Sequence, residues 1–308
     1  ENITGEARFQ SGDPVQTYHG PEFRFSARYA LSNQSSLKAG VNSMRQNIHL
    51  LSNSSVITPT DTWKLSDSFL KPQLGIQYAL GYFKNMNQGA FEFSAELYYR
   101  SMQNLLDYRS GASIVLNDRI EQEVLVTQGK AYGMELYLKK STGKLNGTLA
   151  YTYSRSLMQT DPSEQKEQIN RSEWYPSNFD QPHNANFVGN LELSKRVNVT
   201  LAGKYSTGRP VTLPIAKFNY GGSERVYFSD RNSFRVPDYF RMDLSVNLEG
   251  NHKIAKLAHA SWSFGVYNLL GRDNAYSVYF VPEAGKLRGY QLAIFAEPIP
   301  FITYNFRF

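Results

Sequence analysis

Five histidines and scattered carboxylates are the side chains of this sequence that could act as catalytic groups or metal ligands. The histidines are His19, His49, His183, His252 and His259, and they show no metal-ligand spacing. The chain has no cysteine, which excludes disulfides, thiolate metal sites and cysteine nucleophiles. It also lacks the HExxH, GxSxG, phosphate-loop and GxGxxG patterns. We therefore expect no catalytic residue, no metal, no cofactor and no enzymatic activity.

Two arrangements of charged residues come closest to an enzyme site. His183 follows Asp180 by three residues and could form the Asp–His pair of a protease. A turn that enters a strand explains the segment 180–183 better. Glu92 and Glu96 share one side of an expected strand, where they would lie roughly 13 Å apart. That separation is too large for a catalytic pair of carboxylates, and a polar wall explains both residues.

Candidate binding residues are arginine and aromatic side chains in two long segments, 156–182 and 206–237. Such side chains are common anchors of binding surfaces, and their rings also suit sugars and aromatic ligands. They can equally pack one loop against another, and that alternative stays open for each of them. The candidates are Arg171, Trp174, Tyr175, Arg209, Tyr220, Tyr227, Arg231 and Phe234.

The elements that must position these side chains show a period of two residues, the spacing of a strand with two unlike faces. Residues 90–100, for example, place Phe91 and Leu97 on one face and Glu92 and Glu96 on the other. A helix is excluded because charges at every second residue would surround it with polar groups. We expect an all-β fold with strands at 21–31, 37–45, 72–83, 90–100, 131–139, 145–155, 183–193, 197–205, 238–248, 260–268 and 302–308.

The connections between these segments are alternately short and long. The short ones are 32–36, 84–89, 140–144, 194–196 and 249–259, and the others have 26 to 33 residues. Outer-membrane barrels have this arrangement, with short periplasmic turns and long extracellular loops. Most segments also have about the length that a tilted strand needs to cross a bilayer. We therefore expect a transmembrane antiparallel β-barrel with an apolar face toward lipid and a polar face toward the lumen.

The number of strands carries a further implication. Eleven antiparallel strands cannot close, because the first and last would meet in parallel, and bacterial single-chain barrels have even strand numbers. Either one strand is miscounted or the chain is the C-terminal part of a larger barrel. Residues 1–20 have the composition of an extracellular loop, which favours the second option. We therefore expect residues 1–308 to belong to one barrel domain, with strands, turns and loops over 21–308 and with the first strands outside this chain.

Several motifs carry a family resemblance. The sequence reads GKAYGMEL at 129–136, GTLAYTYS at 147–154, WYPSNFDQPH at 174–183, RMDLSV at 241–246 and VYNLLGRDN at 266–274. In this order they resemble the barrel domain of TonB-dependent receptors, particularly those of Bacteroidota, which include SusC-like members. The last strand ends in Phe308 and resembles the terminal strand that the barrel-assembly machinery recognises.

The resemblance implies a 22-stranded barrel, of which this chain would be half, with an N-terminal plug and a TonB-binding segment outside it. It implies energised import of a scarce nutrient, of the siderophore, glycan, peptide or vitamin class, across the bacterial outer membrane. The implied partners are membrane lipid, the TonB complex, the barrel-assembly machinery and, for SusC-like members, a SusD-like surface lipoprotein lid. Nucleic acid is not an expected partner, because the lysines and arginines behind the net charge of +6 are evenly spread.

Two alternatives remain open at this stage. One is a small closed barrel of about 10 to 12 strands that acts as an enzyme. The other is a barrel retained as a non-transporting scaffold within an outer-membrane complex.

Overall fold

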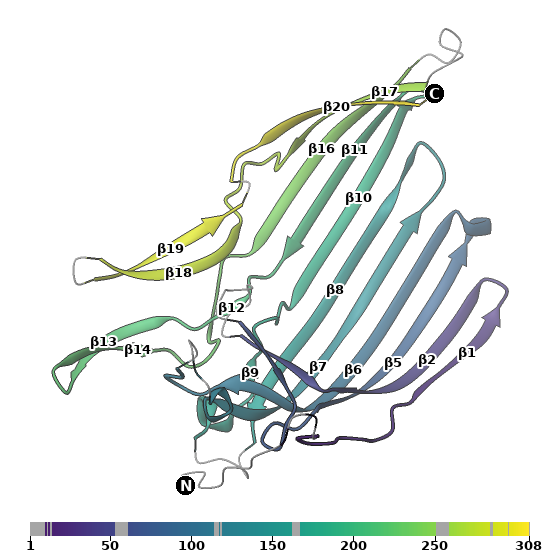
Figure 1. Ribbon diagram of the computed structural model, residues 1–308. Helices are drawn as coiled ribbons and strands as arrows, with labels where there is room; N and C mark the ends of the chain where they lie inside the picture. The colour runs from purple at the N-terminus through teal and green to yellow at the C-terminus, as the bar shows by residue number, and fades with distance from the viewer. Residues whose placement is uncertain are drawn as a thin grey trace.

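The computed structural model describes residues 10, 12, 14–52, 61–113, 117, 119–161, 167–250, 259–283, 286–294 and 296–307. Their dominant feature is one antiparallel sheet (Figure 1). In sheet order its strands are β1 (Arg24–Ser32), β2 (Ser35–Gln46), β5 (Gln73–Met86), β6 (Phe91–Tyr108), β7 (Val124–Lys140), β8 (Leu145–Thr160), β10 (His183–Ser194), β11 (Val197–Ser206), β16 (Tyr239–Glu249), β17 (His259–Tyr267) and β20 (Ile299–Arg307). Each of the eleven predicted segments overlaps one of these strands, so the all-β prediction is confirmed.

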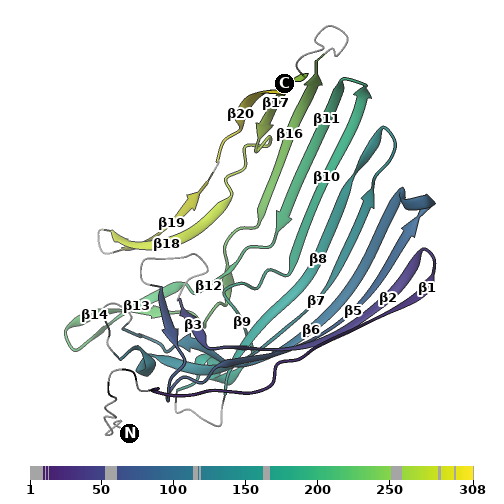
Figure 2. The same ribbon diagram turned by 45° about the vertical axis from the view of Figure 1, so that its right-hand side comes forward.

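The sheet is curved like part of a barrel wall and is open in both views (Figures 1 and 2). Strand β1 pairs with β2, and strand β20 pairs with β17. Among the strands that the structure describes, neither edge strand pairs with a second neighbour, and β1 does not meet β20. No helix within the same described residues is long and apolar enough to cross a membrane.

The two faces of the sheet differ in chemistry along its whole width. Leu80, Leu97 and Met134 are opposite one another in register on three adjacent strands, so they share a face. Leu97 on that face is 53% exposed. Contiguous exposed apolar surface of this kind marks a contact with lipid or with another apolar partner. The predicted apolar face is therefore continuous from strand to strand.

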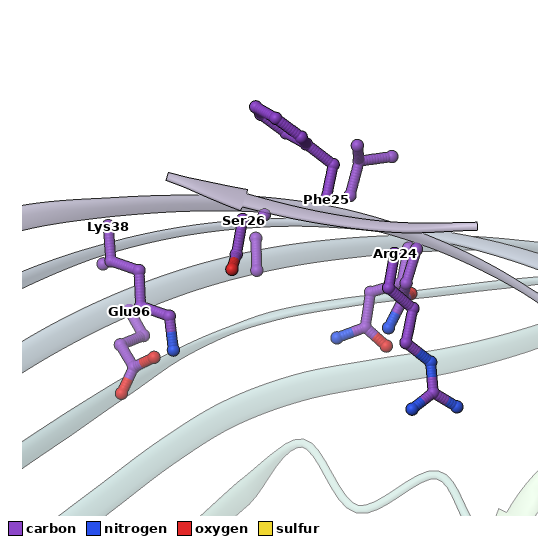
Figure 3. Close-up of a pocket in the computed structure, with 11 residues that line it drawn as sticks. Arg24, Phe25, Ser26, Lys38 and Glu96 are labelled. Carbon is purple, nitrogen blue, oxygen red and sulfur yellow. The ribbon is translucent and has the colours of Figure 1, made fainter. Parts of the chain in front are cut away.

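The opposite face is polar, and its character is clearest near the β1 edge. Figure 3 shows Phe25 on one side of the sheet and Arg24, Ser26, Lys38 and Glu96 on the other. These side chains border a groove of about 320 Å³. Because the two sides alternate residue by residue, this face is the lumen wall of the predicted barrel.

The short connections all lie at one end of the sheet and the long ones at the other (Figure 1). The loop between β5 and β6 is the 3₁₀ turn η1 (Asn87–Gly89). Residues 251–258, within the connection from β16 to β17, lie outside the described residues. The predicted alternation of short and long connections is therefore observed, with the short connections at one rim of the sheet and the long ones at the other.

The long connections contain structure that the sequence did not predict. Two-stranded hairpins form within three of them, the 3₁₀ turns η2 and η3 lie in two, and β9 pairs with the outer part of β8. These elements are β3 (Ile48–Leu51) with β4 (Thr62–Leu65), η2 (Ile120–Gln122), η3 (Ile169–Ser172), β9 (Tyr175–Pro176), β12 (Pro210–Val211) with β15 (Phe234–Arg235), β13 (Pro214–Tyr220) with β14 (Ser223–Phe228), and β18 (Ala275–Glu283) with β19 (Lys286–Ala293).

The predicted strand ends were wrong at the outer rim. Strand β6 continues to Tyr108 and β7 begins at Val124, so the connection predicted at 101–130 is only 109–123. A membrane crossing needs about 9–11 residues, and β6 has 18. Above the lipid both faces meet water, so backbone pairing continues although the apolar–polar alternation stops.

The segment predicted as an extracellular loop lies partly within the described residues. Residues 12 and 14–20 form no strand or helix. The Tyr18 hydroxyl donates to the Asp67 carbonyl oxygen at 2.6 Å, which fixes this part of the chain to a long connection at the outer rim. Phe308, the expected assembly signal, lies outside the described residues.

The orientation of the sheet can be tested with single cysteines in the full-length protein. We expect Ser223→Cys, in the β13–β14 hairpin, to react with a large impermeant polyethylene glycol maleimide added to intact cells. We expect Thr142→Cys, in the β7–β8 turn, to react only after the outer membrane is opened. The reverse pattern of labelling would show that the long connections face the periplasm.

The assignment of the faces can be tested by placing one charge on each side of β8. Leu149 is 50% exposed on the apolar face, and the neighbouring Ala150 lies on the polar face, opposite Tyr137 and Asn186. We expect Leu149→Arg to lower the free energy of unfolding in lipid vesicles by about 2–4 kcal/mol. The matched Ala150→Arg should cost much less, because its guanidinium meets water. Equal losses in urea titrations would overturn the assignment.

Candidate functional site

The outer rim is held together by Asp180, in the motif at 174–183. Its carboxylate is fully buried. One oxygen accepts hydrogen bonds from Arg155 Nε at 3.1 Å and from the Ser156 backbone N–H at 2.6 Å, and the other is paired with Arg235. Arg235 also donates to the carbonyl oxygens of Asp180 and Gly208, at 2.7 and 2.9 Å. A single carboxylate therefore joins the end of β8 to two extracellular connections.

Asp180 and His183 do not form the Asp–His pair that the sequence allowed. His183 begins β10, and its Nδ1 lies 2.9 Å from the Tyr151 hydroxyl oxygen. The Asp180 backbone N–H donates to the Ser177 carbonyl oxygen at 3.0 Å, which closes a turn ahead of the strand. The turn therefore spans 177–180 rather than the predicted 180–183, and a strand follows it as predicted.

A second network centres on Asp107, at the outer end of β6. Its two carboxylate oxygens accept hydrogen bonds from Arg231 Nη1 and from the Tyr175 hydroxyl, both at 2.7 Å. Arg231 Nη2 also donates to the Tyr108 carbonyl oxygen at 2.9 Å, and its backbone N–H donates to Asn170 Oδ1 at 2.7 Å. Tyr175 and Arg231, two of the candidate binding residues, thus join separate loops in this structure.

Burial determines the protonation state of Tyr175 in this network. The Tyr175 side chain is 1% exposed. Burial, reinforced by the adjacent Asp107 carboxylate, raises the pKa of Tyr175 far above its ordinary value. The phenol therefore stays protonated and remains a hydrogen-bond donor to Asp107 at every physiological pH.

The other candidate residues lie closer to the surface. Arg171 pairs with Asp230 at 3.5 Å, and both side chains are mostly exposed. The Trp174 ring lies 3.8 Å from the Lys130 ammonium, measured to the ring centroid, which is a cation–π contact. The remaining aromatic candidates are exposed on β13, β14 and β15, and they are Tyr220, Tyr227 and Phe234.

His49, on β3, is fully buried. Its Nε2 lies 3.1 Å from Ser66 Oγ, and its Nδ1 lies 3.1 Å from Gln73 Nε2, at the start of β5. Burial lowers the pKa of His49, so the neutral ring is the form that holds this hairpin against the barrel wall. Among the residues that the structure describes, no three histidine, aspartate or glutamate side chains gather as a metal site.

The lumen face holds a cavity that sequence reasoning did not find. This mouth pocket has a volume of about 320 Å³ and lies at the outer ends of β10, β11 and β16. Of the sequence candidates, only Arg209 lines it. Its lining includes Asn184, Lys204, Arg209, Tyr239, Arg241, Tyr276 and Ile294. The remaining candidates therefore lie outside this pocket.

The role of Asp180 can be tested by removing its charge. Asp180→Asn leaves Arg155 and Arg235 without their shared counter-charge, and breaking a buried ion pair costs about 3–5 kcal/mol. We expect faster amide hydrogen exchange over residues 207–213 and 229–238 in the full-length protein. Asp230→Asn breaks only the exposed pair with Arg171, worth about 0–1 kcal/mol, and serves as the control. Equal exchange in the two variants would contradict the role given to Asp180.

Comparisons with known proteins agree with this architecture. The family model described as "TonB dependent receptor-like, beta-barrel" matches residues 3–269. A search of curated proteins found no match.

Solved structures share the fold at low sequence identity. The ferric yersiniabactin uptake receptor FyuA of Yersinia pestis is 16% identical with a TM-score of 0.60, over 92% of this chain and 37% of that one. The ferripyoverdine receptor of the outer membrane of Pseudomonas aeruginosa is 13% identical with a TM-score of 0.58, over 92% and 32%. The ferric-catecholate import receptor Fiu of E. coli is 12% identical with a TM-score of 0.57, over 92% and 34%.

This chain therefore spans about a third of the length of each of these receptors. The match of the family model covers most of the eleven-stranded sheet, from the first strand through β17. The chain belongs to the TonB-dependent receptor-like β-barrel family, whose members are proteins of the bacterial outer membrane.

Proposed function

We propose that this chain forms part of the wall of a TonB-dependent receptor that binds a scarce nutrient at its outer mouth and imports it. The observation that carries the proposal is the family match over a sheet with one continuous apolar face and one polar face. Such a wall separates lipid from an aqueous lumen, which an import channel needs and a soluble enzyme does not. We accordingly propose a transporter without catalytic residues.

The open edges support a larger barrel. Each unsatisfied backbone group in hydrocarbon costs several kcal/mol, so roughly five such groups on each of β1 and β20 would cost tens of kcal/mol. A folded domain is stable by only about 5–15 kcal/mol. We propose that further strands of the same protein pair with both edges. The 22 strands implied by the family resemblance would close the barrel.

The partners follow from the same family. We propose that a TonB-binding segment and a plug, both outside this chain, couple the barrel to the TonB complex, and that the barrel-assembly machinery inserts it. A SusD-like lipoprotein lid remains a prediction of the sequence resemblance. The names of the similar structures describe receptors for ferric siderophores, which makes that class one candidate substrate beside glycans, peptides and vitamins.

Import can be tested in the native host by deleting the gene and following the depletion of nutrients from defined media. We expect the deletion strain to lose uptake of one nutrient, and a plasmid copy of the gene to restore it. The same plasmid should fail to restore uptake in a strain that lacks TonB. Unchanged uptake after deletion would favour the scaffold alternative, and uptake that persists without TonB would contradict the proposed mechanism.

A further inference from the structure

The mouth pocket is built from the lumen wall and from the loops above it. Lys204 on β11 is opposite Arg241 on β16 in the strand register. Arg209 and Tyr276 enter from two different extracellular connections. The volume of about 320 Å³ lies at the lower end of the range for small-molecule sites.

The register places two cations against each other. Side chains directly opposite in an antiparallel pair are about 4.5–5.5 Å apart at Cβ, and like charges there destabilise the sheet. Arg241 is compensated by Asp243, which accepts from its Nε at 2.7 Å and from its Nη2 at 2.8 Å. Lys204 has no such carboxylate among the described residues. Its contact is with the Tyr239 ring, 5.9 Å from the ammonium to the ring centroid.

Asp238, which precedes Tyr239 in the chain, is paired with other groups. Asp238 accepts hydrogen bonds from the Tyr205 hydroxyl at 2.7 Å and from the Gly208 backbone N–H at 2.8 Å, and it does not line the pocket. Arg209 also lines the pocket but interacts with other residues, so the charge that lacks a carboxylate partner among the described residues is that of Lys204. The wall of the pocket therefore carries an excess of positive charge at the outer end of the lumen.

The rest of the lining suits an organic molecule rather than a bare ion. Tyr276 and Ile294 contribute apolar surface, and each is 48% exposed. Asn184 contributes an amide whose Oδ1 accepts from Asn186 Nδ2 at 2.8 Å and whose N–H groups can donate to a ligand. Aromatic rings beside a cation and an amide are the usual makeup of a small-molecule site with a few orienting polar groups.

We propose that the mouth pocket binds the anionic group, of carboxylate type, of an organic nutrient that the receptor imports. Lys204 forms the ion pair with this group, and Tyr276 and Ile294 contact the apolar body of the molecule. This inference rests on the proposed import function, since it assigns a substrate class to the same lumen. It makes anionic ligands the substrates of this receptor and disfavours neutral glycans.

The test uses two probes of nearly the same shape and different charge, salicylate and salicylamide, with the purified full-length receptor. Binding is followed by ligand-detected NMR at millimolar concentrations. We expect salicylate to bind at least fivefold more tightly than salicylamide. We expect Lys204→Gln to weaken salicylate binding about tenfold and leave salicylamide unchanged, because a charge-assisted hydrogen bond is lost. Lys204→Arg should retain salicylate binding within about twofold.

The matched control is Lys139→Gln, which removes a lumen-facing lysine that is paired with Glu92 at 3.1 Å, far along the wall from the pocket. It should leave the binding of both probes unchanged. Equal binding of salicylate and salicylamide to the wild-type protein would overturn the proposal. That result is expected if a carboxylate of the plug forms an ion pair with Lys204. Equal losses in Lys204→Gln and Lys139→Gln would also overturn the proposal. Binding to the purified receptor needs neither TonB nor energy. The probes can therefore fail to bind a receptor that imports its nutrient, and they can bind a receptor that does not import, so the two proposals fail independently.

Discussion

The hydrocarbon core of a membrane contains no water that could pair with backbone N–H and C=O groups, and this lack determines how the chain folds. Within hydrocarbon every N–H and C=O must be paired inside the protein, so strands can cross the bilayer only side by side in a closed sheet. The strands of this chain are paired in one uninterrupted antiparallel order from β1 to β20. That pairing forces alternate side chains to opposite faces, and the two faces then meet solvents of opposite polarity. Leu97 meets lipid for the same geometrical reason that Glu96 meets the lumen.

Above the lipid, a second constraint replaces the first. Charges buried among loops need partners, because an uncompensated buried charge is costly. Asp180 and Asp107 each pair with an arginine from the connection between β11 and β16, and Asp107 and Arg231 are 124 residues apart in the sequence. These two carboxylates fix the paths of several loops over the outer rim. Arg235, which pairs with Asp180, also donates to the carbonyl oxygen of Gly208 in the lining of the mouth pocket, so that side of the pocket depends on the same contacts.

Much of the wall was predictable from local sequence, whereas the contacts above it were not. The eleven strands and the turn before His183 follow from alternation and turn residues that lie within a few positions of each other. The outer ends of β6 and β7 were missed because the alternation stops where both faces meet water. The pairing of Arg231 with Asp107 depends on loop paths that no local pattern encodes. Lys204 and Arg241 become neighbours only through the register of β11 and β16, which fixes the pocket but is invisible in either segment alone.

In the proposed barrel, β1 and β20 are interior strands of a larger closed sheet. Amide hydrogen exchange of the full-length protein in lipid nanodiscs, followed by mass spectrometry of peptides, tests it most directly. We expect peptides from the membrane-crossing parts of β1 and β20 to exchange as slowly as those from β7, since all their amides would be paired. Rapid exchange confined to β1 and β20 would show that both edges are open and would contradict the claim.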